Sequence, residues 1–461
     1  MSDRNARNRA PNRRPDKVRQ IAYRVIRQVT AEDGYANLAL NKALRDQRLG
    51  GRDAAFCTEL VHGTLRWQGT YDAILSRSVS RPLDELDPEL LDLLRLGAHQ
   101  LLRMRVDSYA AVNEMVTLTR AEVGQSRSGL VNAVLRKVSQ RTLDQWVSSV
   151  APKPDEDRIG YLVIAQAHPR WVIEAFADAL GNNLDEVEEL LAADNEPPRV
   201  TLVARPGLAE VDELIEAGAT RARWSPYAAV LQGGGDPGRI SAVSSGRAGV
   251  QDEGSQLVAG ALAGAPLEGT DASWLDLCAG PGGKAALLAA IAIQRDALLT
   301  AVEPLPHRAE LVRANLRAVP GDHRVLVGDG TLPTWPEGSF DRVLADVPCS
   351  GLGALRRRPE ARWRRTPEDV ETLRPLQERL LDSAITSARP GGVVAYVTCS
   401  PHPVETRSVV DAVLADRADA TLIDARPLFP GVPSLGEGPD VQLWPHRHGT
   451  DAMYLALIRR S

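Results

Sequence analysis

The sequence predicts a multidomain protein with an all-α N-terminal bundle, a small α+β module and a C-terminal α/β domain built on a doubly wound sheet. Apolar residues recur at helical spacing through the first third of the chain. After residue 251, short apolar strands alternate with helical segments. A chain of 461 residues, 43% of them apolar, is long enough to bury a core in each of two or three domains.

The first 160 residues divide into a tail, a helical domain and a linker. Residues 1–15 are rich in Arg, Asn and Pro and lack periodicity, which predicts a disordered basic tail. Residues 16–150 place Val18, Ile21 and Val25 at helical spacing, and the same pattern recurs up to residue 150. Two prolines and mixed charges make residues 151–160 a linker.

The rest of the chain divides at residue 250. Residues 161–250 carry helical patterns before a β-branched run at 199–203, which predicts the α+β module. Residues 251–461 form the α/β domain, with a helix at 285–292 and strands at 274–277, 299–302, 324–327, 342–345, 393–397 and 453–458. Ligands of such sheets bind beyond the carboxyl ends of the strands.

Composition excludes several classes of protein. The four cysteines lie far apart, without the spacing of a zinc ribbon or a disulfide framework, so we expect no metal. No apolar run approaches the roughly 20 residues that cross a bilayer, and we expect a cytoplasmic protein that does not bind membranes.

Two arginine-rich stretches stand out against the net charge of −5. Residues 1–27 carry nine Arg or Lys against two acids, and residues 356–365 carry six Arg against one Glu. RNA phosphate contact is one interpretation. Ordinary surface is the other, because the chain uses 50 Arg and five Lys overall. Trp363 in the second stretch fits base stacking or loop packing equally well.

A glycine-rich loop follows the first strand of the α/β domain. A Walker A loop would need Gly at position 278 and Ser or Thr at position 285, but this chain has Cys278 and Ala285 there. A dinucleotide loop fits better, since Gly280, Gly282 and Ala285 match GxGxx[G/A] and Glu303 lies 23 residues after Gly280.

S-adenosylmethionine (SAM) is the third candidate ligand. Glycines would let the main chain approach its methionine moiety, Glu303 after the second strand would accept from the ribose hydroxyls, and Asp329 after the third would meet the adenine. Each residue could also be a simple turn residue. The predicted cofactor residues are Cys278, Ala279, Gly280, Pro281, Gly282, Gly283, Lys284, Glu303, Asp329 and Asp346.

Cys349 and Cys399 follow the fourth and fifth strands. A lone strand-end cysteine is usually a packed hydrophobe, but two beside a cofactor loop favour covalent chemistry. C5 of cytosine is too electron-poor to attack a methyl donor directly, and addition of a thiolate at C6 makes it nucleophilic. Asp346 would take the charge that develops at N3, and the target base must be unpaired or flipped.

In these motifs the chain resembles the bacterial Sun/Fmu/RsmB family of 16S rRNA cytosine-C5 methyltransferases. The resemblance covers nearly the whole chain and is carried by the cofactor loop and by segments 251–256, 346–351, 353–363 and 398–400. Segments 56–66 and 131–136 resemble the NusB-like RNA-binding domain of that family, and segment 197–202 resembles its small RNA-binding insert.

This resemblance implies a Rossmann-like class I methyltransferase domain, SAM as methyl donor, Cys399 as the nucleophile and Cys349 as the thiol that assists release. It implies 16S rRNA or a small-subunit assembly intermediate as the substrate, and we expect a monomer. The sequence departs from the family at Ala285, at Val347 and at segment 452–454. An RNA-binding assembly factor that keeps the fold but has little activity and a nicotinamide-linked oxidoreductase are the alternatives.

Overall fold

The computed structural model of the chain describes residues 14–32, 34–233 and 235–461. It divides into two compact units: residues 1–174 with 357–364, and residues 175–356 with 365–461. Nearly all of the predicted basic tail, residues 1–15, lies outside the described residues. The predicted domain limits at residues 150, 160 and 250 remain predictions.

The first unit is helical, and its described residues contain no strand, as the sequence predicts. Helix α1 begins at the cap Asp16, whose carboxylate accepts a hydrogen bond from the main-chain N of Arg19 at 2.9 Å. Its apolar stripe from Val18 to Val29 faces the core of the unit. The helices are α1 (Lys17–Ala31), α2 (Ala36–Asp46), α3 (Gly51–Arg66), α4 (Gln68–Ser76), α5 (Pro88–Leu102), α6 (Ser108–Glu122), α7 (Ser128–Val138), α8 (Leu143–Val150), α9 (Arg158–Ala165) and α17 (Ala361–Arg364), and α10 (Arg170–Ala179) crosses into the second unit.

Most of the arginine-rich stretch belongs to this helical unit, which contains residues 357–364. Arg362 is fully buried, and its Nη1 donates to the main-chain carbonyls of Arg66 at 3.3 Å and Ala167 at 3.2 Å. A guanidinium enclosed in this way cannot reach RNA phosphate. The phosphate-contact prediction is therefore wrong for Arg362.

Trp363 and Arg364 are also engaged within the helical unit. Trp363 Nε1 donates to the carbonyl of Leu65 at 2.7 Å, and a Cβ added at Gly69 would lie 2.3 Å from the indole ring. Arg364 donates to the carbonyl of Gly34 at 2.7 Å. Of the two interpretations of Trp363, loop packing is the one that the structure supports.

Replacement of Arg362 by methionine is expected to lower the free energy of unfolding of the protein by about 2–4 kcal/mol, because two buried carbonyls lose their donor. Urea denaturation followed by circular dichroism measures this change. Arg358→Met is the matched control, since Arg358 is exposed in the same stretch and its guanidinium lies over the exposed ring of Tyr35, so the substitution should change stability by less than about 1 kcal/mol. Equal effects of the two substitutions would contradict the structural role of Arg362.

The second unit begins with the small α+β module that the sequence predicts. Its four strands pair antiparallel in the order β2-β3-β1-β4, and Leu202, Leu214 and Ala229 lie in the core between sheet and helices. Its elements are α11 (Leu184–Asn195), β1 (Thr201–Ala204), α12 (Val211–Glu216), β2 (Ala219–Arg221), β3 (Ala228–Leu231), α13 (Ser241–Ser244) and β4 (Ala248–Val250).

An eight-stranded sheet forms the rest of the second unit. Seven strands run in the order β10-β12-β9-β8-β5-β6-β7, and β11 pairs with β12. Strands β5 to β9 are parallel, whereas β12 runs antiparallel to β9. The strands are β5 (Ser273–Asp276), β6 (Leu298–Glu303), β7 (Arg324–Val327), β8 (Phe340–Asp346), β9 (Ala388–Thr398), β10 (Ala420–Ile423), β11 (Val441–Gln442) and β12 (Tyr454–Arg460). All six predicted strands are present, and the sequence did not predict β10 and β11.

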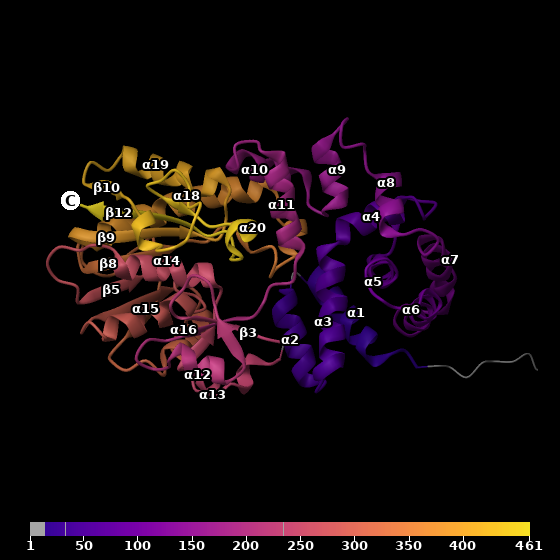
Figure 1. The fold of residues 1–461 in the computed structure, drawn as a ribbon, viewed down its shortest axis with the longest axis horizontal. Helices are drawn as coiled ribbons and strands as arrows, with labels where there is room; N and C mark the ends of the chain where they lie inside the picture. The colour runs from indigo at the N-terminus through magenta and orange to yellow at the C-terminus, as the bar shows by residue number, and fades with distance from the viewer. Residues whose placement is uncertain (1–13, 33, 234) are drawn as a thin grey trace, which may run out of the picture. The chain divides into compact units, whose positions relative to one another are not determined.

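Helices cover both faces of this sheet (Figure 1). Alternate strand residues separate two cores: Leu344 and Val397 pack with α14, α15 and α16, while Val343 and Tyr396 pack with α18 and α19. The helices are α14 (Glu253–Gly264), α15 (Gly283–Ile293), α16 (Pro306–Leu316), α18 (Pro367–Ser387), α19 (Arg407–Ala415) and α20 (Pro445–His448). Among the described residues, no helix is long and apolar enough to cross a membrane.

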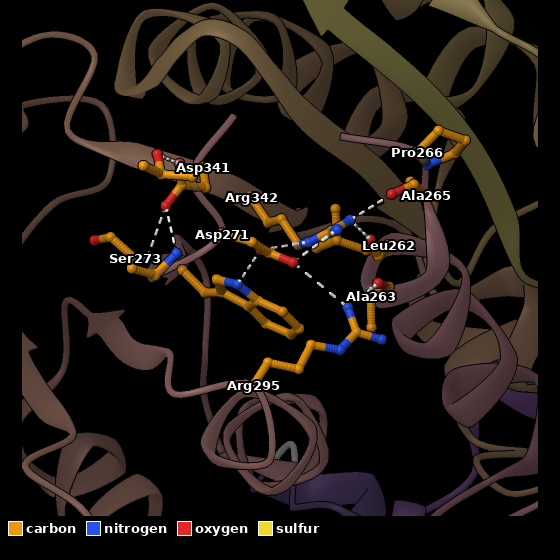
Figure 2. A network of polar contacts seen from close by, with 12 residues as sticks. Leu262, Ala263, Ala265, Pro266, Asp271, Ser273, Arg295, Asp341 and Arg342 are labelled. Atoms are coloured by element: carbon orange, nitrogen blue, oxygen red, sulfur yellow. Dashed lines mark hydrogen bonds and ion pairs between the residues drawn. The ribbon is translucent and has the colours of Figure 1, made fainter. Parts of the chain in front are cut away.

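A buried polar network fixes the amino-terminal edge of the sheet (Figure 2). Asp341, at the start of β8, accepts hydrogen bonds from the main-chain N atoms of Ala272 and Ser273, both at 2.8 Å. The neighbouring Arg342 forms a bidentate ion pair with Asp271 at 2.8 and 2.9 Å. This network holds β5 in register with β8. It therefore also fixes the relative positions of the residues at the carboxyl ends of these two strands.

Candidate active site

The predicted site residues meet at the carboxyl edge of the large sheet. The strand order reverses at β5, because the chain continues to β6 and β7 on one side of β5 and to β8 and β9 on the other. Asp276, Glu303 and Asp346 are the last residues of β5, β6 and β8, and Cys399 directly follows β9. A reversal of this kind is where doubly wound sheets bind their ligands.

The glycine-rich loop connects β5 to α15 in a tight turn. Ala279 N donates to the carbonyl of Val302 on β6 at 2.9 Å, and Gly282 N donates back to the carbonyl of Ala279 at 2.6 Å. Gly282 has φ +104° and caps α15, a conformation that favours glycine. The predicted cofactor residues Cys278, Ala279, Gly280, Pro281, Gly282 and Gly283 all lie in this turn or at the first position of α15.

Gly280 brings the loop against the acid of the second strand. A Cβ at Gly280 would lie 2.0 Å from Glu303 Oε2, so a larger residue would push the carboxylate away. Glu303 is buried, and its Oε1 accepts a hydrogen bond from Leu305 N at 3.1 Å. Arg308 donates to the carbonyl of Gly280 at 2.8 Å and fixes the loop from the other side. Loop and acid could therefore hold one ligand between them.

Asp276 is a site residue that the sequence interpretation missed. Its carboxylate is buried, and among the described residues its Oδ2 has no hydrogen-bond partner. Burial, together with the charge of Asp346, raises the pKa of Asp276 to about 7. A ligand ammonium group would satisfy this oxygen. The available signal was its place at the end of a strand, which it shares with Glu303 and Asp346.

Asp329 follows β7 and builds its own turn. Its Oδ1 accepts hydrogen bonds from the main-chain N of Thr331 at 2.9 Å and from the hydroxyl of Thr331 at 2.8 Å. These bonds, the main-chain one above all, hold the pKa of Asp329 below its usual value. The side chain is exposed beside the sheet edge, and its contact with an adenine ring stays a prediction.

Lys284 and Asp346 form an ion pair at the centre of the edge. Lys284 Nζ lies 2.8 Å from Asp346 Oδ2. Burial alone would lower the pKa of Lys284, but the carboxylate of Asp346, and after it the thiolate of Cys399, raise that pKa. Lys284 therefore stays an ammonium group, close enough to Cys399 to favour negative charge on its sulfur.

The two predicted thiols lie in contact. Cys349 Sγ and Cys399 Sγ are 3.4 Å apart, and both residues are half-buried. The hydrogen bond with Cys399, and then burial, raise the pKa of Cys349 well above its usual range. Cys278, the third thiol at this edge, also has a raised pKa, because of burial and the surrounding carboxylates. The pair can hold one proton between two sulfurs, and either sulfur can be the donor.

Gly353 joins the loop that contains Cys399 to the C-terminal segment. Its N donates to the carbonyl of Cys399 at 2.9 Å, and its own carbonyl accepts from Ala452 N at 2.8 Å. A Cβ at Gly353 would lie 2.2 Å from the carbonyl oxygen of Ala452, so no larger residue fits here. Met453 and Tyr454, the other departures in segment 452–454, are buried and pack in the cores on the two faces of the sheet.

This edge thus combines two thiols in contact, a carboxylate–ammonium pair and a loop suited to a cofactor. Such a set can add sulfur to an electron-poor ring and stabilise the charge that forms. Among the described residues, no group of three or more His, Cys, Asp or Glu side chains is arranged to bind a metal.

Comparison with known proteins gives the same division into an N-terminal and a C-terminal part. Residues 264–459 match the family described as 16S rRNA methyltransferase RsmB/F, and residues 16–140 match the NusB family. A Mycobacterium tuberculosis protein named as a methyltransferase is 53% identical over 457 residues, which cover 98% of this chain and 99% of that protein. The ribosomal RNA small subunit methyltransferase B of Erwinia tasmaniensis is 30% identical over 96% of this chain and 98% of its own.

Solved structures agree on the fold. The crystal structure of PH0851 covers 96% of this chain and 99% of its own, with a TM-score of 0.80 at 22% identity. The structure of NSun6 from Pyrococcus horikoshii with SFG covers 64% of this chain and 99% of its own, with a TM-score of 0.55 at 18% identity. The predicted fold class, a NusB-like bundle joined to a Rossmann-like methyltransferase domain, is confirmed. The chain belongs to the 16S rRNA methyltransferase RsmB/F family.

Proposed function

We propose that this protein transfers a methyl group from SAM to C5 of a cytosine in 16S rRNA, with Cys399 as the attacking nucleophile. The observation that carries the proposal is the pair of thiols 3.4 Å apart at the ends of adjacent strands, beside the ion pair of Lys284 and Asp346. An oxidoreductase or a purely RNA-binding factor would have no use for this arrangement.

The residues at the sheet edge fit SAM. When bound, SAM supplies an electrophilic methyl group on a positive sulfonium. The unpartnered Oδ2 of Asp276 suits the ammonium of its amino acid moiety, and the buried Glu303 against Gly280 suits a ribose. Lys284 and the loop from Cys278 to Gly283 would border the cofactor, and Asp329 would meet its adenine.

Cys399 begins the reaction. Its thiolate, favoured by the nearby ammonium of Lys284, forms a bond to C6 of the cytosine, and the C5–C6 π electrons make C5 nucleophilic. N3 becomes more basic as sulfur adds and takes up the proton that the Cys399 thiol has lost, so that the Asp346 carboxylate accepts a hydrogen bond from N3–H. Lys284 holds the Asp346 carboxylate in one orientation through the 2.8 Å contact. Bound SAM would supply the methyl group that C5 takes, its bond from methyl carbon to sulfur would break, and S-adenosylhomocysteine would be the leaving group.

Cys349 acts in the second half of the reaction. After methylation, a base removes the proton from C5, the C5–C6 double bond re-forms and the bond between Cys399 Sγ and C6 breaks. The electron pair returns to sulfur, and a thiol in contact with that sulfur stabilises the thiolate as it leaves. The raised pKa of Cys349 keeps it protonated for this task.

Replacing Cys349 by alanine is expected to slow release and leave the protein covalently joined to unmodified RNA. Loss of one hydrogen bond to a charged group costs about 1.5–3 kcal/mol, so turnover should fall roughly 10- to 10²-fold. Denaturing gel electrophoresis with labelled RNA detects the joined species. Normal turnover by this variant, without a covalent complex, would remove Cys349 from the release step.

A structured RNA is the substrate that this organisation suits. A cytosine must leave its stack for sulfur to reach C6, and the domain that matches the NusB family would bind the surrounding RNA. The substrate is free 16S rRNA or a small-subunit assembly intermediate, which places the protein in the cytoplasm, and we expect it to act as a monomer.

Bisulfite sequencing of 16S rRNA from a strain lacking this protein tests the proposal. One cytosine methylated in the parent strain should lose its methyl group, and the intact gene should restore it. Complementation with Cys399→Ser is the matched control and should leave that cytosine unmethylated. An unchanged methylation pattern in the deletion strain would rule out 16S rRNA as the substrate.

A further inference from the structure

Glu405 is a buried carboxylate that no step of the proposed reaction uses. It lies in the turn between β9 and α19 and is 0% exposed. Its Oε1 accepts a hydrogen bond from the main-chain N of Ser350 at 2.7 Å, and its Oε2 accepts one from the hydroxyl of Ser350 at 2.5 Å. Because Ser350 directly follows Cys349, the Glu405 carboxylate holds the Cys349 loop through the main-chain amide and the hydroxyl group of Ser350.

Gln377 holds the same loop from the other side of Cys349. This residue of α18 is fully buried, and its Nε2 donates to the carbonyl of Pro348 at 2.9 Å and to Glu405 Oε1 at 3.1 Å. The carbonyl before Cys349 and the amide after it are thus fixed by one connected pair of side chains. The main chain at Cys349 has little freedom to shift.

The network also reaches the nucleophile loop. The hydroxyl groups of Ser350 and Ser400 are 3.1 Å apart, and Ser400 directly follows Cys399. On β9, Tyr396 donates from its hydroxyl group to the carbonyl of Glu405 at 2.8 Å. Both cysteine loops therefore share one set of buried hydrogen bonds, with the Glu405 carboxylate at its centre.

We propose that Glu405 is a positioning residue for product release, which holds the Cys349 loop so that Cys349 Sγ stays in contact with Cys399 Sγ. The proposal rests on the proposed function, in which the Cys349 thiol donates to the departing sulfur. Glu405 touches neither sulfur through its hydrogen bonds, so its action passes through Ser350 and Gln377.

A carboxylate suits this position because it accepts several hydrogen bonds and has no donor of its own to satisfy. A neutral apolar residue would leave the Ser350 amide and the Gln377 side chain without partners in a buried place. The loop could then move, and a displacement of about 1 Å at a reacting group can cost roughly 10²-fold in rate. The charge of Glu405 also contributes, after Cys399 and burial, to the raised pKa of Cys349.

The test compares Glu405→Ala with Glu405→Gln in the full-length protein, with 16S rRNA and labelled SAM. Glu405→Ala should keep single-turnover methyl transfer within about threefold of wild type, because Cys399 is intact. Its kcat should fall at least about tenfold, with KM for RNA little changed, and the covalent complex should accumulate on unmodified RNA. Glu405→Gln keeps an oxygen for the Ser350 amide and should restore most of the turnover.

Asp341→Asn is the control for a general loss of stability. Asp341 is also a buried carboxylate that accepts main-chain hydrogen bonds, but it lies at the opposite end of β8. It should lower thermal stability without accumulating the complex. If Glu405→Ala fails to fold, Gln377→Ala and Ser350→Ala take its place and should show slowed release in the same assay.

Turnover at the wild-type level without a covalent complex, in Glu405→Ala or in both replacement variants, would overturn the positioning role. A decrease in single-turnover methyl transfer that matches the decrease in kcat would also overturn it, since release would not be the step affected. If Cys349→Ala itself accumulates no complex, the release role of Cys349 fails instead. The two failures are thereby distinguished.

Discussion

Substitution of Cys399 by serine is expected to lower the rate of methyl transfer by roughly 10⁴-fold or more, the scale on which covalent enzymes lose activity without their nucleophile. A hydroxyl group at this position is far harder to ionise than a thiol, so the electrostatic support from Lys284 is too weak to make it a nucleophile. Transfer of label from SAM to 16S rRNA measures the rate.

Cys57→Ala provides the control for cysteine loss in general. Cys57 is fully buried in the core of the helical unit, so this variant should lose stability but keep the activity of the folded fraction. Circular dichroism of Cys399→Ser should match wild type, because Cys399 is only partly buried where it packs against the core and serine is no larger. Methyl transfer by folded Cys399→Ser within about tenfold of wild type would exclude Cys399 as the nucleophile.

Asp346→Asn is expected to lower methyl transfer by roughly 10²- to 10³-fold, the usual cost of removing one group that stabilises charge in a transition state. The amide has the same shape but carries no charge, so it is a weaker acceptor for the hydrogen bond from N3–H. It also leaves the ammonium of Lys284 without its 2.8 Å partner. Single-turnover transfer with saturating SAM measures the chemical step directly.

Asp341→Asn is the matched control on the same strand. β8 begins at Phe340 and ends at Asp346, and at about 3.3 Å per residue Asp341 lies roughly 16 Å from Asp346. Its substitution should destabilise the base of the sheet that Figure 2 shows, without slowing transfer in the folded protein. If the two variants transfer methyl groups at similar rates, Asp346 has no direct role in the chemistry.

The sequence was sufficient to predict the fold class and the edge of the sheet where the candidate site residues meet. Glu303 and Asp346 end apolar strands, Cys399 directly follows one, and Cys349 lies three residues beyond Asp346. Parallel strands bring their carboxyl ends to one edge. Strands β10 (Ala420–Ile423) and β11 were not predicted, because both are short and are defined by pairing with β12 more than by their own pattern.

Contacts between distant residues could not be predicted from the same pattern. Lys284 and Asp346 pair across 62 positions, and no local spacing links Glu405 to Ser350. For the arginine-rich stretch, the local pattern predicted an exposed surface. Arg362 is instead buried, and its guanidinium donates to main-chain carbonyl groups. Burial of a charged residue depends on tertiary partners that composition does not reveal.

At the level of sequence, only the family resemblance indicated that Cys399 and not Cys349 is the nucleophile. In the structure the charge of Lys284 interacts with Cys399, and the pKa of Cys349 is raised first by its hydrogen bond with Cys399 and then by burial. The assignment of Cys399 as the nucleophile stays a prediction.

Peptide mapping of a trapped complex tests the central claim most directly. Fluorine at C5 cannot leave as a proton does, so 16S rRNA that carries 5-fluorocytosine should stay joined to the enzyme after methyl transfer. We predict that mass spectrometry finds the nucleotide adduct on the peptide that contains Cys399, and that Cys399→Ser forms no adduct. An adduct on the peptide that contains Cys349, or a complex that persists in Cys399→Ser, would contradict the account.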